Sequence, residues 1–230
     1  MGYKSSTIAK YRALLNDAMN HYKCGVCHVS ISLGNRKIGK CLNVSLAPII
    51  ACGANCRVCA GICYDIKACL FRKQVLDARA RNTVLALYER DEYFEEIDRK
   101  MTNRRKHKVF RWHVGGDIPD SDYFERMIEN ARKHPDFVIW TYTKQYHIVN
   151  DYVRSHGGNI ESAIPSNLSI MYSVWDGLTC DNPYGFATFE CVLDGHEWPI
   201  GVHKCNGACH ECVEHQTGCP YRINSAVAEH

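Results

Sequence analysis

Helical spacing of apolar residues alternates with short apolar runs along most of the chain. Apolar positions that recur every three or four residues predict helices, the second broken near Asp91, over 1–19, 66–101, 121–133 and 146–155. Short apolar or alternating runs predict strands over 28–33, 43–50, 109–114, 137–142 and 168–174, and weaker ones over 186–193 and 198–202. Strands separated by helices are typical of parallel βαβ units, whose ligands gather at the carboxyl ends of the strands.

This order of elements predicts an α/β fold with a partial (βα) barrel. We divide the sequence into an N-terminal helix with a cysteine knuckle (1–42), a βα-repeat core (43–176) and a cysteine-rich C-terminal extension (177–230). At roughly 30 residues for each unit, the chain has room for about six βα units, which leaves little for substrate recognition.

Composition excludes few classes of function. The net charge of +3 gives no general attraction to nucleic acid or to an anionic membrane, and the basic run 104–108 predicts a solvated loop. No stretch approaches the roughly 20 apolar residues of a membrane helix, and the polar N-terminus lacks the apolar run of a signal peptide. We therefore expect a cytoplasmic, monomeric protein without a membrane partner.

Cysteine content changes this picture. The chain has 14 cysteines, far above ordinary usage. In a reducing cytoplasm, clustered cysteines bind metal more often than they form disulfides. The two dense groups of cysteines are therefore the main candidates for chemistry.

The first group consists of Cys52, Cys56, Cys59 and Cys63, directly after a predicted strand. From Cys52 the spacing is C-x3-C-x2-C, which resembles the motif of radical SAM enzymes. In those enzymes three thiolates bind a 4Fe-4S cluster and leave one iron open for the amino and carboxylate groups of S-adenosylmethionine. The spacing equally allows a triplet that ends at Cys63, or a closed zinc or iron–sulfur site that uses all four thiols.

A glycine turn follows the strand predicted over 109–114. It resembles the Gly-Gly-Glu-Pro segment of radical SAM proteins, where backbone groups bind the methionyl amine. Glycine would allow close approach of a ligand, and Asp117 would suit an ammonium group; alternatively, Asp117 or Asp120 caps the next helix. For His113, the alternative to a proton carrier is a buried strand histidine. The candidate cofactor-binding residues are Gly115, Gly116, Asp117, His113 and Thr141.

The second group consists of Cys205, Cys209, Cys212 and Cys219 in the C-terminal extension. A glycine-rich polar segment cannot build a core alone, so a metal cross-link would order it. Zinc and an iron–sulfur cluster both accept four thiolates; Pro220 after the last cysteine and the company of the first group favour iron–sulfur. His210 and His215 are candidates to replace one thiol.

The other cysteines suggest no separate site. Cys24 and Cys27 form a short knuckle that could join distant cysteines in a mixed site. Cys69 is expected to be a buried apolar residue on a helix. We expect Cys41, Cys180 and Cys191 to be buried singly.

Short segments along the chain carry a family resemblance: residues 37–40, 45–48, Cys52, Cys59, Cys63-Tyr64, Arg111, His113, Gly116-Asp117, Tyr142-Thr143 and the late cysteines. Together they resemble the gene-product-eighty-eight family of phage proteins over most of the chain. The resemblance implies Cys52, Cys59 and Cys63 as the shared thiols, with Cys56 as an extra one. The sequence departs from the family pattern at Gly53 and Asp65. A viral or mobile-element origin, host-cell cytoplasm and an iron–sulfur site are implied more firmly than any reaction.

Two functions remain open. One is a small radical SAM-like enzyme that cleaves S-adenosylmethionine reductively and abstracts a hydrogen from an unidentified small molecule. The other is a non-catalytic iron–sulfur or zinc protein, in which the metal holds the fold and the surface binds a host protein, a viral protein or nucleic acid. Three thiolates at the first group would favour the enzyme, and four would favour the binding protein.

Overall fold

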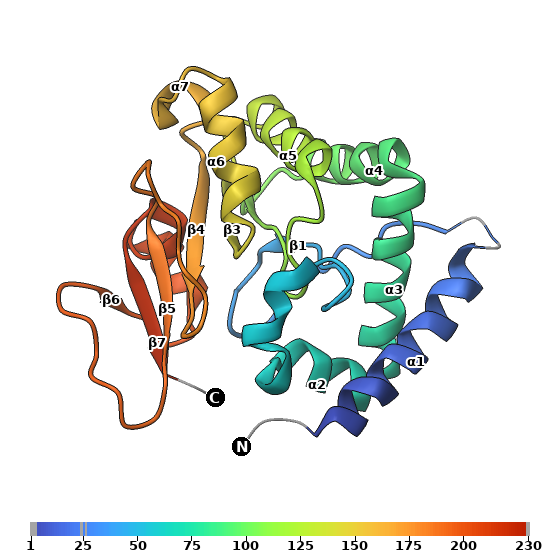
Figure 1. Ribbon diagram of the computed structural model, residues 1–230. Coiled ribbons are helices and arrows are strands. Elements are labelled where there is room, and N and C mark those ends of the chain that lie inside the picture. The colour runs from blue at the N-terminus through green and yellow to red at the C-terminus, as the bar shows by residue number, and fades with distance from the viewer. Residues whose placement is uncertain (1–3, 24, 26, 229–230) are drawn as a thin grey trace.

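The computed structural model describes residues 4–23, 25 and 27–228. Within them, a curled sheet of seven strands forms half a barrel, with strand order β1-β2-β3-β4-β5-β7-β6 and parallel pairing throughout (Figure 1). The α/β class and the partial barrel predicted from the sequence are confirmed. The parallel arrangement places the carboxyl ends of the strands, and the loops that follow them, at one edge of the sheet.

The sheet alternates with helices only over its first half. The strands are β1 (Leu42–Asn43), β2 (Val109–Arg111), β3 (Val138–Thr143), β4 (Leu168–Val174), β5 (Thr188–Val192), β6 (His203–Lys204) and β7 (Ser225–Ala228). The helices are α1 (Ser5–Lys23), α2 (Tyr64–Phe71), α3 (Lys73–Tyr88), α4 (Arg90–Thr102), α5 (Ser121–Lys133), α6 (Tyr146–Ser155), α7 (Ile160–Ala163) and α8 (Cys209–Glu214). The short 3-10 turns are η1 (Gly53–Val58), η2 (Ala60–Ile62) and η3 (Cys219–Tyr221).

Strongly amphipathic segments match the sequence prediction. Helices α5 and α6 and strand β4 have the predicted bounds, and the break expected near Asp91 falls between α3 and α4. The segment 66–101 contains a further break, because Arg72 adopts an extended conformation with φ −132° and ψ 100° between α2 and α3. Helices α7 and α8 were not predicted, since each is too short to show a clear apolar period.

Three predicted strands are wrong. Segment 28–33 makes only an isolated bridge between Ser32 and Asn43, and segment 43–50 leaves the sheet after Asn43. The backbone N–H of Leu46 donates to the carbonyl of Gly115 at 3.0 Å, so this segment follows the glycine turn instead of a strand. The strand expected over 198–202 is absent from the described residues there, and β6 begins at His203.

The two faces of the sheet have different covers. Helices α4, α5 and α6 pack on the outer face, where Phe110, Ile139 and Ile170 are buried. On the inner face, Trp140 and Met171 pack with Cys219 of η3 and with Val213 of α8. The C-terminal extension therefore adds β5, β6 and β7 to the sheet and also fills part of its inner face.

Helices α1, α2 and α3 form a separate layer beside the first cysteine group. Helix α1 buries Tyr11, Leu15 and Met19 against the other two helices. The hydroxyl of Tyr11 donates to the carbonyl of Pro48 at 3.2 Å, four residues before Cys52. This layer therefore supports the segment that enters the first cysteine group.

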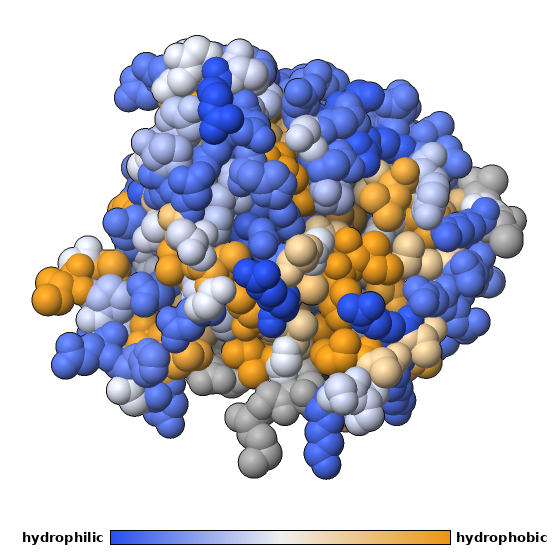
Figure 2. All heavy atoms as spheres, in the orientation of Figure 1, coloured by the Kyte–Doolittle hydropathy of each residue, from blue (hydrophilic) through white to orange (hydrophobic). Residues whose placement is uncertain are grey.

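The surface combines charged groups with apolar areas. Figure 2 shows apolar side chains gathered near the centre of one face, over the region of η1, η2 and α2 in Figure 1. Ile50, Tyr64 and Phe71, from this region, are exposed apolar residues. In the part of the chain that the structure describes, no helix is both long enough and apolar enough to cross a membrane.

Candidate functional site

The first cysteine group is carried by two short turns that follow β1. Cys52 precedes η1, Cys59 joins η1 to η2, and Cys63 precedes α2. The backbone N–H of Cys59 donates to the carbonyl of Cys56 at 3.2 Å, which closes the first turn. All four thiols belong to partly buried residues. The tight winding brings cysteines spread over twelve positions into one loop.

Burial is the main influence on the pKa of three of these thiols. Burial raises the pKa of Cys52 well above its ordinary value, and Asp117, Cys63 and Cys59 raise it further. Burial, with contributions that include Cys59, raises the pKa of Cys63 to about 11. Burial also raises the pKa of Cys56, and Cys59 adds to this effect. Cys52, Cys56, Cys59 and Cys63 thus lie on one loop, and the triplet implied by the family resemblance stays a prediction.

The first cysteine group lies on one loop but does not form a finished metal site. Among residues 4–23, 25 and 27–228, no three Cys, His, Asp or Glu side chains already stand at metal-binding distances. Iron and zinc bind thiolate sulfur at about 2.3 Å, so the loop would have to contract around a metal. The donor set itself, partly buried thiols on one loop, fits a thiophilic metal or an iron–sulfur cluster.

Two hydrogen bonds join the cysteine loop to residues that follow β3. The side-chain amide of Gln145 donates to the carbonyl of Cys52 at 2.6 Å, and the side-chain amide of Asn55 donates to the carbonyl of Lys144 at 2.6 Å. Gly53 has a φ of +57°, and a Cβ there would lie 3.3 Å from the Gln145 amide nitrogen. The carboxyl end of β3 and the cysteine loop are therefore fixed to each other.

Asp117 organises the same strand end. Its carboxylate accepts hydrogen bonds from the Thr143 hydroxyl at 2.7 Å, the Lys144 N–H at 2.9 Å and the Ile118 N–H at 2.7 Å. Burial raises the pKa of Asp117, against the lowering effect of these donors. The cap of α5 is Asp120, which accepts from the N–H of Tyr123. Asp117 therefore positions the residues under Cys52 and does not cap the helix.

The glycine turn packs against the protein itself. A Cβ on Gly115 would lie 1.8 Å from Oδ2 of Asp65, and one on Gly116, whose φ is +82°, would lie 2.8 Å from the carbonyl oxygen of Leu46. The close approach predicted from the two glycines is thus made to Asp65 and Leu46. The turn fixes the segment that leads into the cysteine loop.

A buried ion pair completes this support. Arg79 of α3 donates to both carboxylate oxygens of Asp65 at 2.9 and 2.8 Å, and both side chains are largely buried. The neighbouring Tyr64 hydroxyl donates to the carbonyl of Val114. Helix α2, which begins directly after Cys63, is therefore tied to α3 and to the end of β2.

His113 and Thr141 contribute buried polar groups near the strand ends. Nε2 of His113 lies 3.0 Å from the Tyr123 hydroxyl, whereas Nδ1 of His113 and Oγ1 of Thr141 have no hydrogen-bond partner in the described part of the chain. Burial, assisted by the charge of Arg111, lowers the pKa of His113 to about 3. The φ of +53° at His113 is unusual for a residue other than glycine. His113 is thus a neutral, strained and buried histidine.

The second cysteine group lies against the inner face of the sheet. Cys205 follows β6, Cys209 and Cys212 are one turn apart on α8, and Cys219 begins η3. Burial, with smaller contributions from Cys209, Cys219 and Cys205, raises the pKa of Cys212 to about 11. That these four cysteines share one metal site stays a prediction.

The histidine nearest these thiols is one that sequence reasoning missed. Nε2 of His203 lies 3.4 Å from Sγ of Cys212. His210 instead contacts the carbonyl of Lys37 at 3.2 Å, and His215 is an exposed residue at the end of α8. The available signal was the spacing of two positions between His203 and Cys205, because such residues share a face where the chain is extended.

The remaining cysteines show no common arrangement. Cys69 is 2% exposed and Cys41 is 1% exposed, which confirms both as buried residues. Cys180 and Cys191 are only partly buried, contrary to expectation. Cys27 is partly buried against the outer core, and its predicted partner Cys24 lies outside the described residues.

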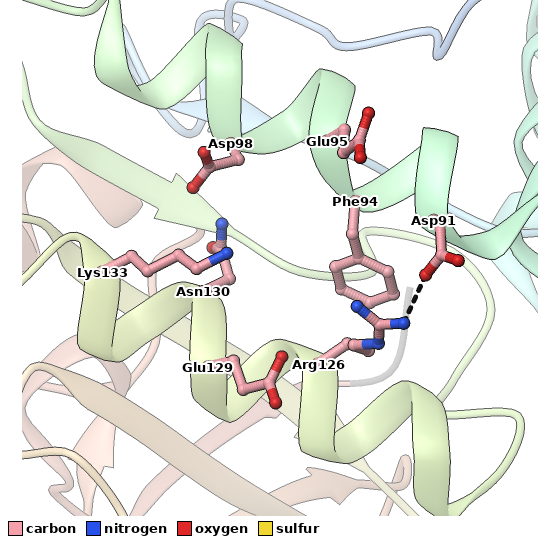
Figure 3. Close-up of a pocket in the computed structure, with 8 residues that line it drawn as sticks. All are labelled: Asp91, Phe94, Glu95, Asp98, Arg126, Glu129, Asn130 and Lys133. Carbon is pink, nitrogen blue, oxygen red and sulfur yellow. Dashed lines mark hydrogen bonds and ion pairs between the residues drawn. The ribbon is translucent and has the colours of Figure 1, made fainter.

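The pocket in Figure 3 is a separate feature. Its volume is about 140 Å³, and it lies between α4 and α5, on the outer layer of helices. Arg126 pairs with Asp91 at one end of the pocket, and Lys133, Glu129 and Asn130 line the rest with both signs of charge. None of its lining residues is a cysteine or a predicted site residue.

Comparison with known proteins adds one decisive finding. A family model described as Gene product 88 matches residues 12–180. The chain belongs to the Gene product 88 family. The matched segment includes the first cysteine group and the glycine turn, and it ends before the second cysteine group. No curated protein and no solved structure matches the chain.

The match to the Gene product 88 family covers the first cysteine group and not the second. The first group and its supports, from Asp65 to Gln145, lie inside the segment that defines the family. The second group lies in the part of the chain beyond it. Neither the family description nor its extent assigns a cluster, S-adenosylmethionine or a reaction to this protein.

Proposed function

We propose that this member of the Gene product 88 family binds an iron–sulfur cluster on Cys52, Cys59 and Cys63, with S-adenosylmethionine as the ligand of the open iron. The observation that supports the proposal is that the three cysteines lie on one short loop, which Gln145 and Asn55 join by hydrogen bonds to the residues around the carboxyl end of β3. The loop lies at the carboxyl ends of parallel strands, where α/β folds place their ligands. When bound, the cluster would chelate the cofactor and supply an electron to its sulfonium.

The surrounding residues would orient this site. Asp117 accepts hydrogen bonds from Thr143 and Lys144, and Gln145 donates one to the Cys52 carbonyl. These bonds would keep one end of the cysteine loop in place while its thiols bind a cluster. The unpartnered polar atoms of His113 and Thr141 are candidates to bind a cofactor group. The exposed apolar residues around η1 and α2 would reduce water access to a small-molecule substrate.

A second function is favoured by two observations. Cys56 lies in the same turn as Cys59. Its thiolate would be a fourth ligand that closes the cluster or binds zinc. The C-terminal extension also fills part of the inner face, where an open barrel would admit substrate. In this alternative the metal is structural, and the protein binds a host or viral partner or nucleic acid.

Anaerobic purification followed by iron, acid-labile sulfide and zinc analysis separates these functions. We expect iron and sulfide in the wild type, their loss from the first site in Cys59→Ser, and no change in the matched control Cys69→Ser. Spin-resonance spectra should change when S-adenosylmethionine is added, and Cys56→Ser should keep that response. Zinc without sulfide would rule out an iron–sulfur cluster. An intact cluster that ignores S-adenosylmethionine would rule out the radical SAM-like enzyme.

A further inference from the structure

Arg111 is a half-buried cation whose guanidinium lies beside Tyr142 and Cys209. Its guanidinium lies 4.8 Å from the ring centre of Tyr142. Its charge and a hydrogen bond lower the pKa of Cys209, against the larger effect of burial. No ion pair joins Arg111 to a carboxylate among the described residues, and its Nε has no hydrogen-bond partner there. A guanidinium whose buried Nε has no partner would be stabilised by a nearby anion.

Trp140 has a second unpartnered donor on the inner face of the sheet. Trp140 is fully buried on the inner face and packs in one cluster with Cys219 and Cys41. Its indole N–H has no hydrogen-bond partner in the described part of the chain. Metal-bound thiolate is an anionic acceptor, and N–H donors around such sulfurs are usual companions of the ligands.

Backbone groups of the second cysteine group lie close to its sulfur atoms. The N–H of Gly207 donates to Sγ of Cys205 at 3.4 Å, which is a bond that stabilises a thiolate. Gly218 has a φ of +63°, and a Cβ there would lie 3.0 Å from Sγ of Cys212 and 3.1 Å from the His203 ring. The Ser169 hydroxyl donates to the carbonyl of Cys219 at 2.5 Å, which ties η3 to β4.

We propose that Cys205, Cys209, Cys212 and Cys219 hold a second, closed metal centre whose negative charge is balanced by Arg111. Cys209 and Cys219 pack in one cluster on the inner face, and Cys212 lies against Gly218 and the His203 ring, so α8 and η3 bring thiols of the extension to the same region. Four thiolates with zinc, or with a 4Fe-4S cluster, carry a net negative charge, so either centre would supply an anion beside Arg111.

The centre would lock the C-terminal extension onto the sheet. Its ligands come from β6, α8 and η3, and Arg111 comes from β2, so metal binding would join distant parts of the chain. Four protein ligands leave no open position, which is the arrangement of structural sites. This inference concerns thiols other than those of the proposed function and does not rest on it.

The test uses full-length protein in which the first site has been removed by Cys59→Ser. All remaining metal should then belong to the second site, and adding Cys212→Ser should remove at least about nine-tenths of it, whereas adding Cys180→Ser should remove none. Acid-labile sulfide identifies a cluster, and zinc without sulfide identifies a zinc ion; both support the proposal. Equal metal in the Cys212→Ser and Cys180→Ser proteins, or no metal in the Cys59→Ser protein, would overturn it.

The charge-balancing role of Arg111 is tested by metal retention against a chelator. Arg111→Met should release metal about tenfold faster than the wild type, and Arg111→Lys should be intermediate because it keeps the charge. Trp140→Phe, which removes the N–H and keeps most of the ring, should also release metal faster. Arg111→Met and Trp140→Phe proteins that both retain metal as the wild type does would show that these donors do not serve the centre.

Discussion

At the scale of single residues, unsatisfied polar atoms are concentrated between the two cysteine groups. Five such atoms belong to β2, β3 or the residues directly after β2: Arg111 Nε, Trp112 Nε1, His113 Nδ1, Trp140 Nε1 and Thr141 Oγ1. Each buried polar group without a partner costs about 1–3 kcal/mol. These atoms lower the stability of β2 and β3, the strands that carry residues of both candidate sites. Unsatisfied polar groups of this kind are expected at functional sites.

The stability cost of burying His113 can be measured from the pH dependence of the free energy of unfolding. Its folded-state pKa of about 3 lies below the ordinary value of 6.5, so unfolding takes up a proton between these values. The associated stability is complete above pH 6.5 and is lost as the pH falls toward 3. Between pH 7.5 and pH 5 the free energy of unfolding should fall by about 2 kcal/mol more in the wild type than in His113→Asn.

Urea unfolding at the two pH values checks this prediction. Asparagine is the matched replacement, because it does not titrate and it tolerates the positive φ at this position. Any cavity left by the smaller side chain lowers stability at both pH values and cancels in the comparison. Parallel pH profiles of the two proteins would mean that His113 is not held neutral in the folded state.

At the scale of elements, long amphipathic segments were predictable and short ones were not. Helices α5 and α6 show a clear apolar face, and both were found with their bounds. Strand β1 has only two residues, because the backbone of Leu46 bonds to the glycine turn. That partner is about seventy positions away, so no local pattern could reveal it. The cysteine spacing revealed both groups, but His203, Arg111 and Gln145 reach them only through the fold.

Helix α1 offers a test of element packing with adjacent leucines. Leu15 is 1% exposed against α3, whereas Leu14 is 39% exposed. Leu15→Ala should lower the free energy of unfolding by about 2–5 kcal/mol, because it leaves a cavity in the helical layer. Leu14→Ala should cost less than about 1 kcal/mol. Chemical denaturation measures both, and similar losses in the two variants would contradict the packing of α1 described above.

At the scale of the whole molecule, the C-terminal extension is part of the sheet. The sequence pattern weakens after Asp176, which suggested an appendage, yet β5 pairs with β4 and then with β7. The pairing of β6 with β7 also joins segments separated by about twenty residues, beyond the reach of a local period. The match to the Gene product 88 family ends at residue 180, so the sheet of this protein continues past the segment that defines its family.

A chain ended after Cys180 therefore should not fold as a stable domain. It would lack β5, β6 and β7 and would expose Trp140 and Met171, which are fully buried in the complete protein. Large exposed apolar surface favours aggregation, so we expect loss of cooperative thermal unfolding and strong binding of a hydrophobic dye. The control is replacement of residues 195–200 by a short glycine–serine linker, because this loop is largely exposed and Ile200 has no buried surface. The linker variant should melt cooperatively, within a few degrees of the wild type. A truncated protein that also melts cooperatively would show that the family segment alone forms the domain, and that the extension only decorates it.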